Sequence, residues 1–335
     1  MANLIKVHGS QNSFFILDQT KLKTALTDDQ LRKLAQHLTN HQTGVLGGAD
    51  GLLVVNKPTR PGALAQMRVI NADGSEASMC GNGLRTVARY LAERDQKESF
   101  KVDTMDASLQ VRREKDFAPD VPSFAVEISP VRFNKEALPF DNLGHDRLLG
   151  TPVPEFAPQL TFSAIAIPNP HLISFVSQEV IEGPLLGELG PYLNGDNPYF
   201  SDGVNVNFAH ILGPNHLFVR TYERGVGFTN ACGTGMSATS LAFVLLHGDQ
   251  GAFDEPITVY NPGGMVKTVV HYQDRRYWVE LVGNATFTHH IKVEEADLHQ
   301  ASVNAENCTI TATGEQVAYE QFIRHLPKFN LSQRN

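Results

Sequence analysis

The sequence is short of cysteine, of basic charge and of long apolar runs, and each shortage excludes a class of protein. Three cysteines in 335 residues are too few for a disulfide scaffold, and no C-x-x-C spacing suggests structural zinc. The net charge of −8 provides no basic field for nucleic acid or for an anionic membrane. The longest purely apolar stretch, residues 241–246, is far too short to span a bilayer.

The hydrophobic content and the length of the chain are typical of a globular protein. A hydrophobic content of 41% over 335 residues can bury a sizeable core, and the length favours about two domains. The first residues contain neither the apolar core of a signal peptide nor a small-residue cleavage site. We therefore expect a cytoplasmic protein, in which the cysteines remain thiols.

The pattern of short apolar runs predicts a β-rich chain with few helices. Runs of alternating or continuous apolar residues predict strands at 14–18, 51–55, 107–114, 123–129, 162–167, 205–212, 216–223 and 277–282. A capping box from Thr27 to Gln30 starts a surface helix over 28–39. Proline and glycine between Pro139 and Pro158 indicate an irregular connection, and residues from about 294 form a weakly patterned C-terminal extension.

The most informative feature is a short word that occurs twice, at 79–83 (MCGNG) and at 231–235 (ACGTG). In each, a cysteine and a G-x-G turn precede a run that predicts a helix, so the thiol lies beside helix N-terminal amides that favour thiolate. Because Cys80 and Cys232 are 152 positions apart, we expect two similar halves. The first helix, with Arg85 and Arg89, is predicted to be amphipathic, and the second to be buried.

Two thiols of this kind suit one reaction class. The α-hydrogen of an amino acid is weakly acidic, so its removal needs a strong base and stabilisation of the carbanion. A base on one face and an acid on the other would invert the stereocentre, while helix N-terminal amides bind the carboxylate. A buried cysteine is more often a small core residue, but a core cysteine needs no glycine turn.

Other motifs are weaker when taken alone. Glu223 and Arg224 could hold the charged ends of an amino acid or form a solvated pair at a strand end. The turn-forming run 71–76 is a plain loop unless its closeness to Cys80 makes it a substrate contact. His171 is a structural residue rather than a metal ligand on spacing alone, and no glycine-rich word fits a dinucleotide or phosphate loop.

Seven words in order carry a family resemblance. They are His8-Gly9 with Asn12 and Phe14, NADGSE (71–76), MCGNG-x-R (79–85), NPH (169–171), NVNF (205–208), ERG-x-G (223–227) and ACGTG (231–235). Over about residues 4–292 the chain resembles the diaminopimelate epimerase family. The resemblance implies an α+β fold of two pseudo-symmetric β-barrel-like halves, each wrapped around a central helix, with the active site between them. It implies that the first half consists of 1–126 plus 284–335, in which the tail from about 294 is unassigned. The second half consists of 127–283.

The resemblance also implies roles for individual residues. Cys80 and Cys232 would be the catalytic base and acid of a reaction that interconverts LL-2,6-diaminopimelate and the meso form for lysine and peptidoglycan synthesis, without pyridoxal phosphate or metal. His171 would orient a thiol or tune its titration. The substrate would be bound by Asn12, Asn71, Gly81, Asn82, Gly83, Asn169, Asn205, Glu223, Arg224, Gly233, Thr234 and Gly235.

Some positions depart from the family pattern, and alternatives stay open. Phe228 stands where many members have a glutamate, Thr86 where a second cysteine often follows, and Gly51 where some have a glutamine. The runner-up is a cofactor-independent racemase or epimerase of another amino acid, such as histidine. A non-catalytic amino-acid-binding protein is a third reading, against which the two retained thiols argue. The expected partner is a small amino acid, with neither nucleic acid nor membrane, and a homodimer is the assembly left open.

Overall fold

The computed structural model describes residues 1–331 and divides the chain into two compact units. Unit 1 consists of Met1–Val126 and Val282–His325, and unit 2 of Glu127–Leu281 with residues 326–331. The sequence prediction assigned all of 284–335 to the first half, and of these residues 332–335 lie outside the described part. In the structure, residues 326–331 belong to unit 2 instead. The reason is aromatic packing, since the ring of Phe329 stacks on that of Phe218 in unit 2 with centroids 3.8 Å apart.

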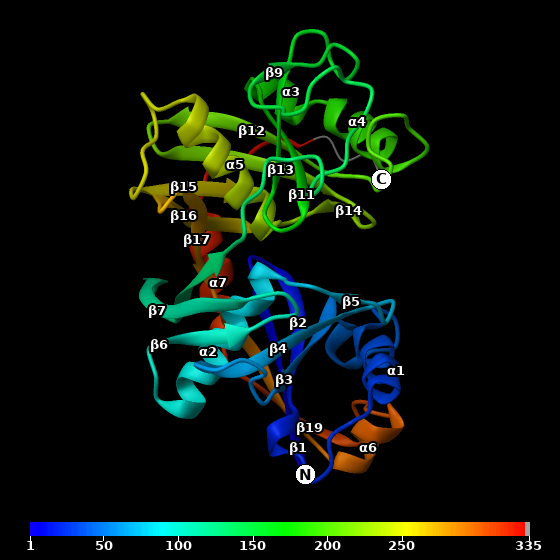
Figure 1. Cartoon of the computed structure of the whole chain (residues 1–335). Coiled ribbons are helices and arrows are strands. Elements are labelled where there is room, and N and C mark those ends of the chain that lie inside the picture. Colours follow the sequence, from blue (N-terminus) through cyan, green and yellow to red (C-terminus); the bar gives the residue numbers. More distant parts are fainter. Residues whose placement is uncertain (332–335) are drawn as a thin grey trace. The chain divides into compact units, whose positions relative to one another are not determined.

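Unit 1 is a sheet around one central helix (Figure 1). Its strands are β1 (Ala2–Gly9), β2 (Asn12–Asp18), β3 (Gly51–Asn56), β4 (Ala63–Asn71), β5 (Glu76–Ala77), β6 (Ser99–Asp103), β7 (Ser108–Ala118), β8 (Val121–Ile128), β18 (Thr286–Val293) and β19 (Cys308–Ala312). Its helices are α1 (Asp28–Thr39), α2 (Gly81–Asp95), α6 (Glu295–Gln300) and α7 (Glu315–Arg324). The central helix, α2, packs against β1 and β7.

Unit 2 contains β9 (Thr151–Pro152), β10 (Thr161–Ala166), β11 (Pro170–Phe175), β12 (Asn205–Gly213), β13 (His216–Glu223), β14 (Gly227–Thr229), β15 (Pro256–Asn261), β16 (Gly264–Gln273) and β17 (Arg276–Asn284). Its helices are α3 (Gln178–Glu182), α4 (Leu185–Asn194) and α5 (Gly233–Leu246). The central helix, α5, packs against β11 and β16.

The two units repeat one pairing scheme. In unit 1, β1 is antiparallel to β2, β2 parallel to β3, β3 antiparallel to β4, and β4 antiparallel to β5 and parallel to β6. In unit 2, β10, β11, β12, β13, β14 and β15 pair in the same directions and order. The central helix follows the fifth strand of the series in each case. The predicted α+β fold of two similar halves is confirmed.

The local predictions agree with the structure where the pattern was strong. Thr27 and Gln30 form the capping box of α1 through reciprocal side-chain and backbone bonds. Leu31, Leu34 and Leu38 of this helix are fully buried, as the apolar spacing predicts. Each of the eight predicted strand runs overlaps a strand of the structure, and the connection over 139–158 holds only the two-residue β9.

The central helices differ from each other in a way the sequence predicted only in part. From Gly233 to Val244, α5 is buried at every position, as expected. The prediction that α2 has an exposed polar face is wrong for Arg85, which is 0% exposed, and for Arg89, which is 8% exposed. The C-terminal extension covers Arg89, because Glu315 of α7 accepts hydrogen bonds of 2.6 and 2.7 Å from it, and Tyr319 of the same helix interacts electrostatically with Arg85.

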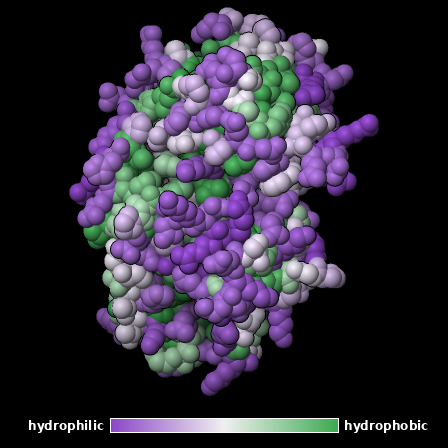
Figure 2. Space-filling view, turned by 90° about the vertical axis from the view of Figure 1, so that its left-hand side faces the viewer, coloured by the Kyte–Doolittle hydropathy of each residue, from purple (hydrophilic) through white to green (hydrophobic). Residues whose placement is uncertain are grey.

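The exterior is mixed in character. Figure 2 shows hydrophilic residues over much of one face, with smaller hydrophobic areas among them. Of the helices in the described part of the chain, none has both the length and the apolar character that a bilayer crossing requires.

Candidate active site

Cys80 caps the N-terminus of α2. Its backbone is extended, and its Sγ accepts a hydrogen bond of 3.4 Å from the N–H of Gly83. The glycine turn thus lets a sulfur take the place that a serine or aspartate oxygen usually fills at an N-cap. The first turn of a helix presents amides without intrahelical acceptors, so the thiol of Cys80 lies in a region of positive potential.

Asn12 lies beside this thiol. Its Oδ1 accepts a bond of 3.2 Å from the side chain of Asn82 and lies 3.8 Å from Cys80 Sγ, within reach of a thiol donor. Its Nδ2 donates to the Asp50 carboxylate at 2.8 Å, and the same carboxylate oxygen accepts from the backbone N–H of Ser13. Unit 1 therefore brings together three residues of the predicted site, and Asp50, which the sequence analysis missed, fixes one of them.

Asn71 ends β4 directly opposite Gly51 of β3. Its side chain donates to the hydroxyl of Ser75 at 3.0 Å, and its carbonyl accepts from the N–H of Gly74. Both bonds close the turn between β4 and β5. In the described structure, then, Asn71 organises the loop that leads to Cys80.

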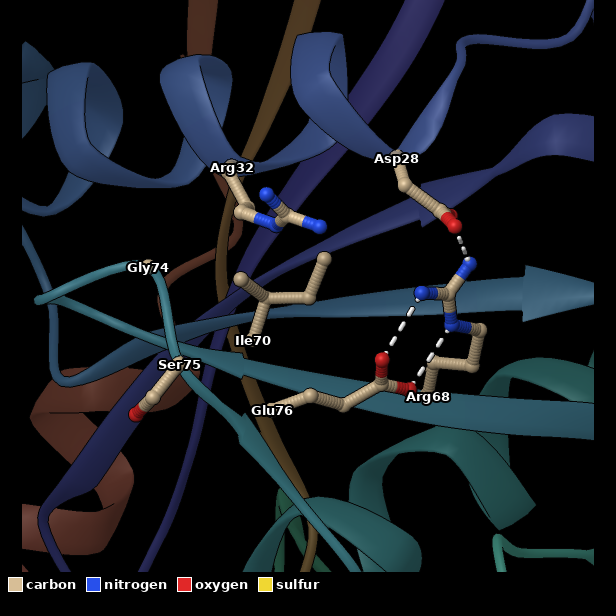
Figure 3. A pocket seen from close by; sticks show the side chains of 7 residues that line it. All are labelled: Asp28, Arg32, Arg68, Ile70, Gly74, Ser75 and Glu76. Carbon is tan, nitrogen blue, oxygen red and sulfur yellow. Dashed lines mark hydrogen bonds and ion pairs between the residues drawn. The ribbon is translucent and has the colours of Figure 1, made fainter.

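A cavity of about 240 Å³ opens beside this turn, on the side that faces α1 (Figure 3). Arg68 crosses it and forms ion pairs of 2.7 Å with both Asp28 and Glu76. None of the predicted site residues lines this cavity. The ion pairs tie the β4–β5 hairpin to the first turn of α1, so the cavity belongs to the scaffold of the loop.

Cys232 repeats the geometry of Cys80 in unit 2. It caps α5, and its Sγ accepts from the N–H of Gly235 at 3.3 Å and lies 3.5 Å from the hydroxyl of Thr234. This cysteine is only 6% exposed. Burial raises the pKa of the Cys232 thiol well above its ordinary value, and the nearby charge of Glu223 raises it further.

Glu223 and Arg224 adjoin in sequence but have different surroundings. The carboxylate of Glu223 accepts from the hydroxyl of Thr229 at 2.7 Å and is within hydrogen-bonding reach of Cys232. The guanidinium of Arg224 is exposed and donates to the carbonyl of Asp202 at 3.0 Å. Its backbone N–H donates to the side chain of Asn205 at 2.8 Å, which brings a second predicted residue to this strand end.

His171 is fully buried on β11 and contacts Asn207. The amide nitrogen of Asn207, which can only donate, lies 3.1 Å from Nδ1 and also near the carbonyls of Leu172 and Asn205, an arrangement that favours the ring proton on Nε2. Burial, with a contribution from Arg224, lowers the pKa of His171 to about 3, so the ring is neutral. Within residues 1–331, Nε2 has no hydrogen-bond partner. Asn169 lies in the turn that precedes β11, where its carbonyl accepts from Ile167.

Asn207 is the site residue that the sequence analysis missed in unit 2. Besides holding His171, its Oδ1 accepts from the hydroxyl of Thr221 at 2.9 Å. It also lies under the first turn of α5, where a Cβ at position 235 would come within 2.3 Å of its Oδ1. Glycine at 235 therefore permits the close approach of helix and strand. The alternation in NVNF is the signal, because it puts Asn205 and Asn207 on one face.

Phe228 faces away from the Glu223 side of its strand. It pairs with Tyr222 in the register of β13 and β14, whereas Glu223 and Thr229 lie on the alternate face. The guanidinium of Arg220 lies 4.3 Å from the centre of its ring, and the ring of Tyr222 meets it edge-on with centroids 5.5 Å apart. The departure from the family pattern at this position therefore changes packing under α4 rather than the surroundings of Cys232.

Solved structures show the class of fold to which two such cysteine-capped units belong. A phenazine biosynthesis protein of the PhzF family from Bacillus anthracis superimposes with a TM-score of 0.59 at 14% identity, covering 86% of this chain and 97% of that one. A probable proline racemase from Agrobacterium radiobacter superimposes with a TM-score of 0.56 at 14% identity, covering 89% and 96%. At this identity the likeness concerns the fold alone.

Sequence comparison then gives the family. A family model described as diaminopimelate epimerase matches residues 4–128 and 163–288. The chain is 52% identical to the diaminopimelate epimerase of Lactiplantibacillus plantarum over 97% of this chain and 98% of that one, and 45% identical to that of Listeria innocua over 97% and 96%. The chain belongs to the diaminopimelate epimerase family. These alignments also include the extension beyond residue 293, which the relatives therefore share.

Proposed function

We propose that this protein epimerises LL-2,6-diaminopimelate to meso-diaminopimelate with two thiols and without a cofactor. The observation that carries the proposal is the repeated cap: each central helix begins at a cysteine whose sulfur accepts from the amide three residues on. The substrate follows from the relatives, which are named diaminopimelate epimerase. The product would serve the synthesis of lysine and of peptidoglycan precursors.

The proposed reaction removes one proton from the α-carbon through one sulfur and returns a different proton through the other. A thiolate removes the hydrogen from the α-carbon on one face and becomes a thiol, while the second thiol returns a proton on the opposite face and becomes a thiolate. Negative charge that develops on the substrate carboxylate is stabilised by helix N-terminal amides. The amides proposed for this role belong to Gly81, Asn82, Gly83, Gly233, Thr234 and Gly235.

The remaining predicted residues are proposed to hold the substrate ends. Asn12, beside Cys80, and Asn205, beside Glu223, are supported by their hydrogen bonds near the cap of each unit. His171 is supported as a positioning residue by its contact with Asn207 and by its Nε2, which has no partner within residues 1–331. Asn71, Asn169, Glu223 and Arg224 complete the set. Thiol catalysis requires reduced cysteines, and all three cysteines are unbridged, which supports a reducing cytoplasmic setting.

The test is incubation with a panel of amino acids in heavy water, with α-deuterium incorporation and stereochemistry followed by NMR and chiral chromatography. We expect exchange and inversion with LL- and meso-diaminopimelate and none with histidine or proline. Inversion of another amino acid alone would make the protein a different epimerase. Binding of an amino acid without exchange would favour the non-catalytic reading.

A further inference from the structure

A buried cation lies behind one of the two caps. Arg85, five positions after Cys80, is 0% exposed. Long side chains on a helix point back toward its N-terminus, so a guanidinium at this position reaches toward the first turn. Its Nε donates to the carbonyl of Asn284 at 3.2 Å and its Nη2 to the hydroxyl of Ser10 at 3.4 Å. Nη1 has no hydrogen-bond partner among the described residues.

The pocket is built for this group. A Cβ at Gly9 would lie 2.8 Å from Nη2, and a Cβ at Gly283 would lie 2.6 Å from Cζ, so two glycines leave the space that the planar guanidinium fills. Arg85 forms no ion pair with a carboxylate of the described residues. A buried charge without a partner is costly, so an anion nearby would be strongly favoured.

The thiol of Cys80 is the group that can supply the anion. Burial lowers the pKa of Arg85 to about 10, and the electrostatic attraction of Cys80 acts against that lowering. The guanidinium therefore stays charged at neutral pH. It follows that the positive charge of Arg85 favours thiolate at Cys80 by the same interaction.

The other titratable groups of unit 1 that interact with Arg85 are neutral at neutral pH, and the carboxylate nearest to Asn12 is exposed. His8 of β1 is buried and its pKa is lowered to about 4, mainly by burial, so it is neutral. Burial also raises the pKa of Tyr319 on α7, which keeps its phenol protonated against the guanidinium. The Asp50 carboxylate is exposed, acts through Asn12 and interacts with the charge of Lys6. The 3.8 Å contact of Cys80 with Asn12 favours the thiol, but sulfur is a weak donor.

Unit 2 differs in charge at the two equivalent positions. Five residues after Cys232 stands Ser237, whose hydroxyl donates to the carbonyl of Gly233 at 2.9 Å. Nine residues before the cysteine, unit 1 has neutral Asn71 and unit 2 has Glu223, whose charge opposes ionisation of Cys232. One cap thus has a buried cation and the other a carboxylate.

We infer that Arg85 makes Cys80 the ionised thiol of the resting enzyme, which leaves Cys232 as its protonated partner. This inference rests on the proposed two-thiol function and adds which of the two thiols is ionised before the substrate binds. An enzyme with Cys80 as thiolate and Cys232 as thiol is ready to take a proton on the Cys80 side. Arg85 is accordingly a positioning residue that acts through Cys80.

The test titrates each thiol separately by the ultraviolet absorbance of thiolate, which does not depend on access of a reagent. One chain keeps Cys80 with Cys232→Ala and Cys308→Ala, and the other keeps Cys232 with Cys80→Ala and Cys308→Ala. At neutral pH we expect a thiolate signal, lost on acidification, from the first chain and none from the second. A signal from the Cys232 chain alone would overturn the inference.

Variants of Arg85 assign the effect. In the Cys80 chain, Arg85→Met should raise the pH midpoint of the thiolate signal by about one to two units. Arg85→Lys, which keeps the positive charge, should have a midpoint close to that of the parent chain. Ser237→Ala, the matched change in α5, should leave the Cys80 midpoint unchanged. Circular dichroism checks that each variant is folded. If Arg85→Met does not fold, Arg85→Gln, which removes the charge but keeps a hydrogen-bond donor, takes its place, with the same rise of the midpoint expected and the same midpoint as the parent chain overturning the role of Arg85.

Failure of the inference and failure of the proposed function can be told apart. A midpoint that stays the same in folded Arg85→Met, in a protein that still inverts diaminopimelate, would refute the role of Arg85 alone. Absence of inversion in the intact enzyme, with the Arg85 effect present, would refute the proposed function and leave the charge asymmetry standing.

Discussion

Units 1 and 2 share an order of strands, but the side chains on and around their central helices differ in polarity and charge. α5 is enclosed by the apolar interior of its own unit, and its hydroxyls turn back on the helix, as Ser237 does to Gly233 and Ser240 to Met236. α2 has two buried arginines and needs the C-terminal extension, with Glu315, to cover one of them. The duplicated scaffold therefore sets where each sulfur lies, and side chains that the two units do not share, Arg85 in unit 1 and Glu223 in unit 2, set the charge around it.

Removal of either thiol should have the largest effect and should expose a difference between the units. Cys80→Ala and Cys232→Ala should each lower the epimerisation rate by more than about 10⁴-fold, at or beyond the upper limit for a general base, because the other sulfur serves one face only. Each variant should still exchange the α-hydrogen of one epimer with heavy water, and the two should prefer opposite epimers. Either variant with a tenth of the parent rate would rule out the two-thiol scheme.

Asn207 has no polar counterpart in unit 1. Leu53 lies against Gly83 there as Asn207 lies against Gly235. Asn207→Leu would leave His171 and the Thr221 hydroxyl without partners, so the free energy of unfolding should fall by about 2–5 kcal/mol in urea titrations. The matched change in unit 1, Leu53→Met, should cost less than about 1.5 kcal/mol. Equal losses would mean that the polar contacts of Asn207 contribute nothing specific.

Each unit also buries one neutral histidine, which makes stability depend on pH. The folded-state pKa of His8 is about 4 and that of His171 about 3, both below the unfolded value of about 6.5. The unfolded chain therefore binds protons first, so this contribution to stability is complete above about pH 6.5, declines as the pH falls from there toward the folded values, and levels off below them. His8 alone should account for about 3 kcal/mol at pH 4.

Urea titrations at pH 7 and pH 4.5 measure this loss. His8→Asn should remove the unit 1 part of the pH dependence and keep that of unit 2. An unchanged difference between the two pH values in His8→Asn would show that His8 is not responsible.

The smallest effect is expected at Phe228, whose ring packs on Arg220 and Tyr222, neither of which is a predicted site residue. Phe228→Leu should cost about 1 kcal/mol of stability, since it removes the stacking on Arg220 and the contact with Tyr222. Its kcat/KM for diaminopimelate should stay within about twofold of the parent, because the ring lies on the face away from Glu223. A change of substrate preference in this variant would contradict that placement.

The parts of this structure that follow from local pattern were accessible from the sequence. The duplicated cysteine words, the capping box at Thr27 and the alternating strand runs each depend on residues a few positions apart. They predicted the two caps, α1 and much of the sheet. The irregular run over 139–158 was predicted for the same reason, because proline and glycine act on the nearby backbone.

The parts that were missed depend on distant residues. Arg85 and Arg89 fit a solvent-exposed face until Glu315 and Tyr319, more than 200 positions on, are placed over them. The extension buries Leu298 and Val303 in the core of unit 1, but its helices are short, so a hydrophobic period does not mark them in the sequence. Asn207 was missed because a buried asparagine shows its role only when its partners on neighbouring strands are known.

The return of the chain to unit 1 has a consequence for how the protein is made. β1 pairs with β18 so that Ala2 meets Val293 and His8 meets Thr286. On a ribosome that adds about 5–20 residues per second, the first strand waits roughly 15–60 s for this neighbour. During that interval one edge of β1 is open, and open strand edges invite pairing with other chains. Most of unit 2 leaves the ribosome within that interval, so the second half of the gene product is expected to reach its folded form before the first.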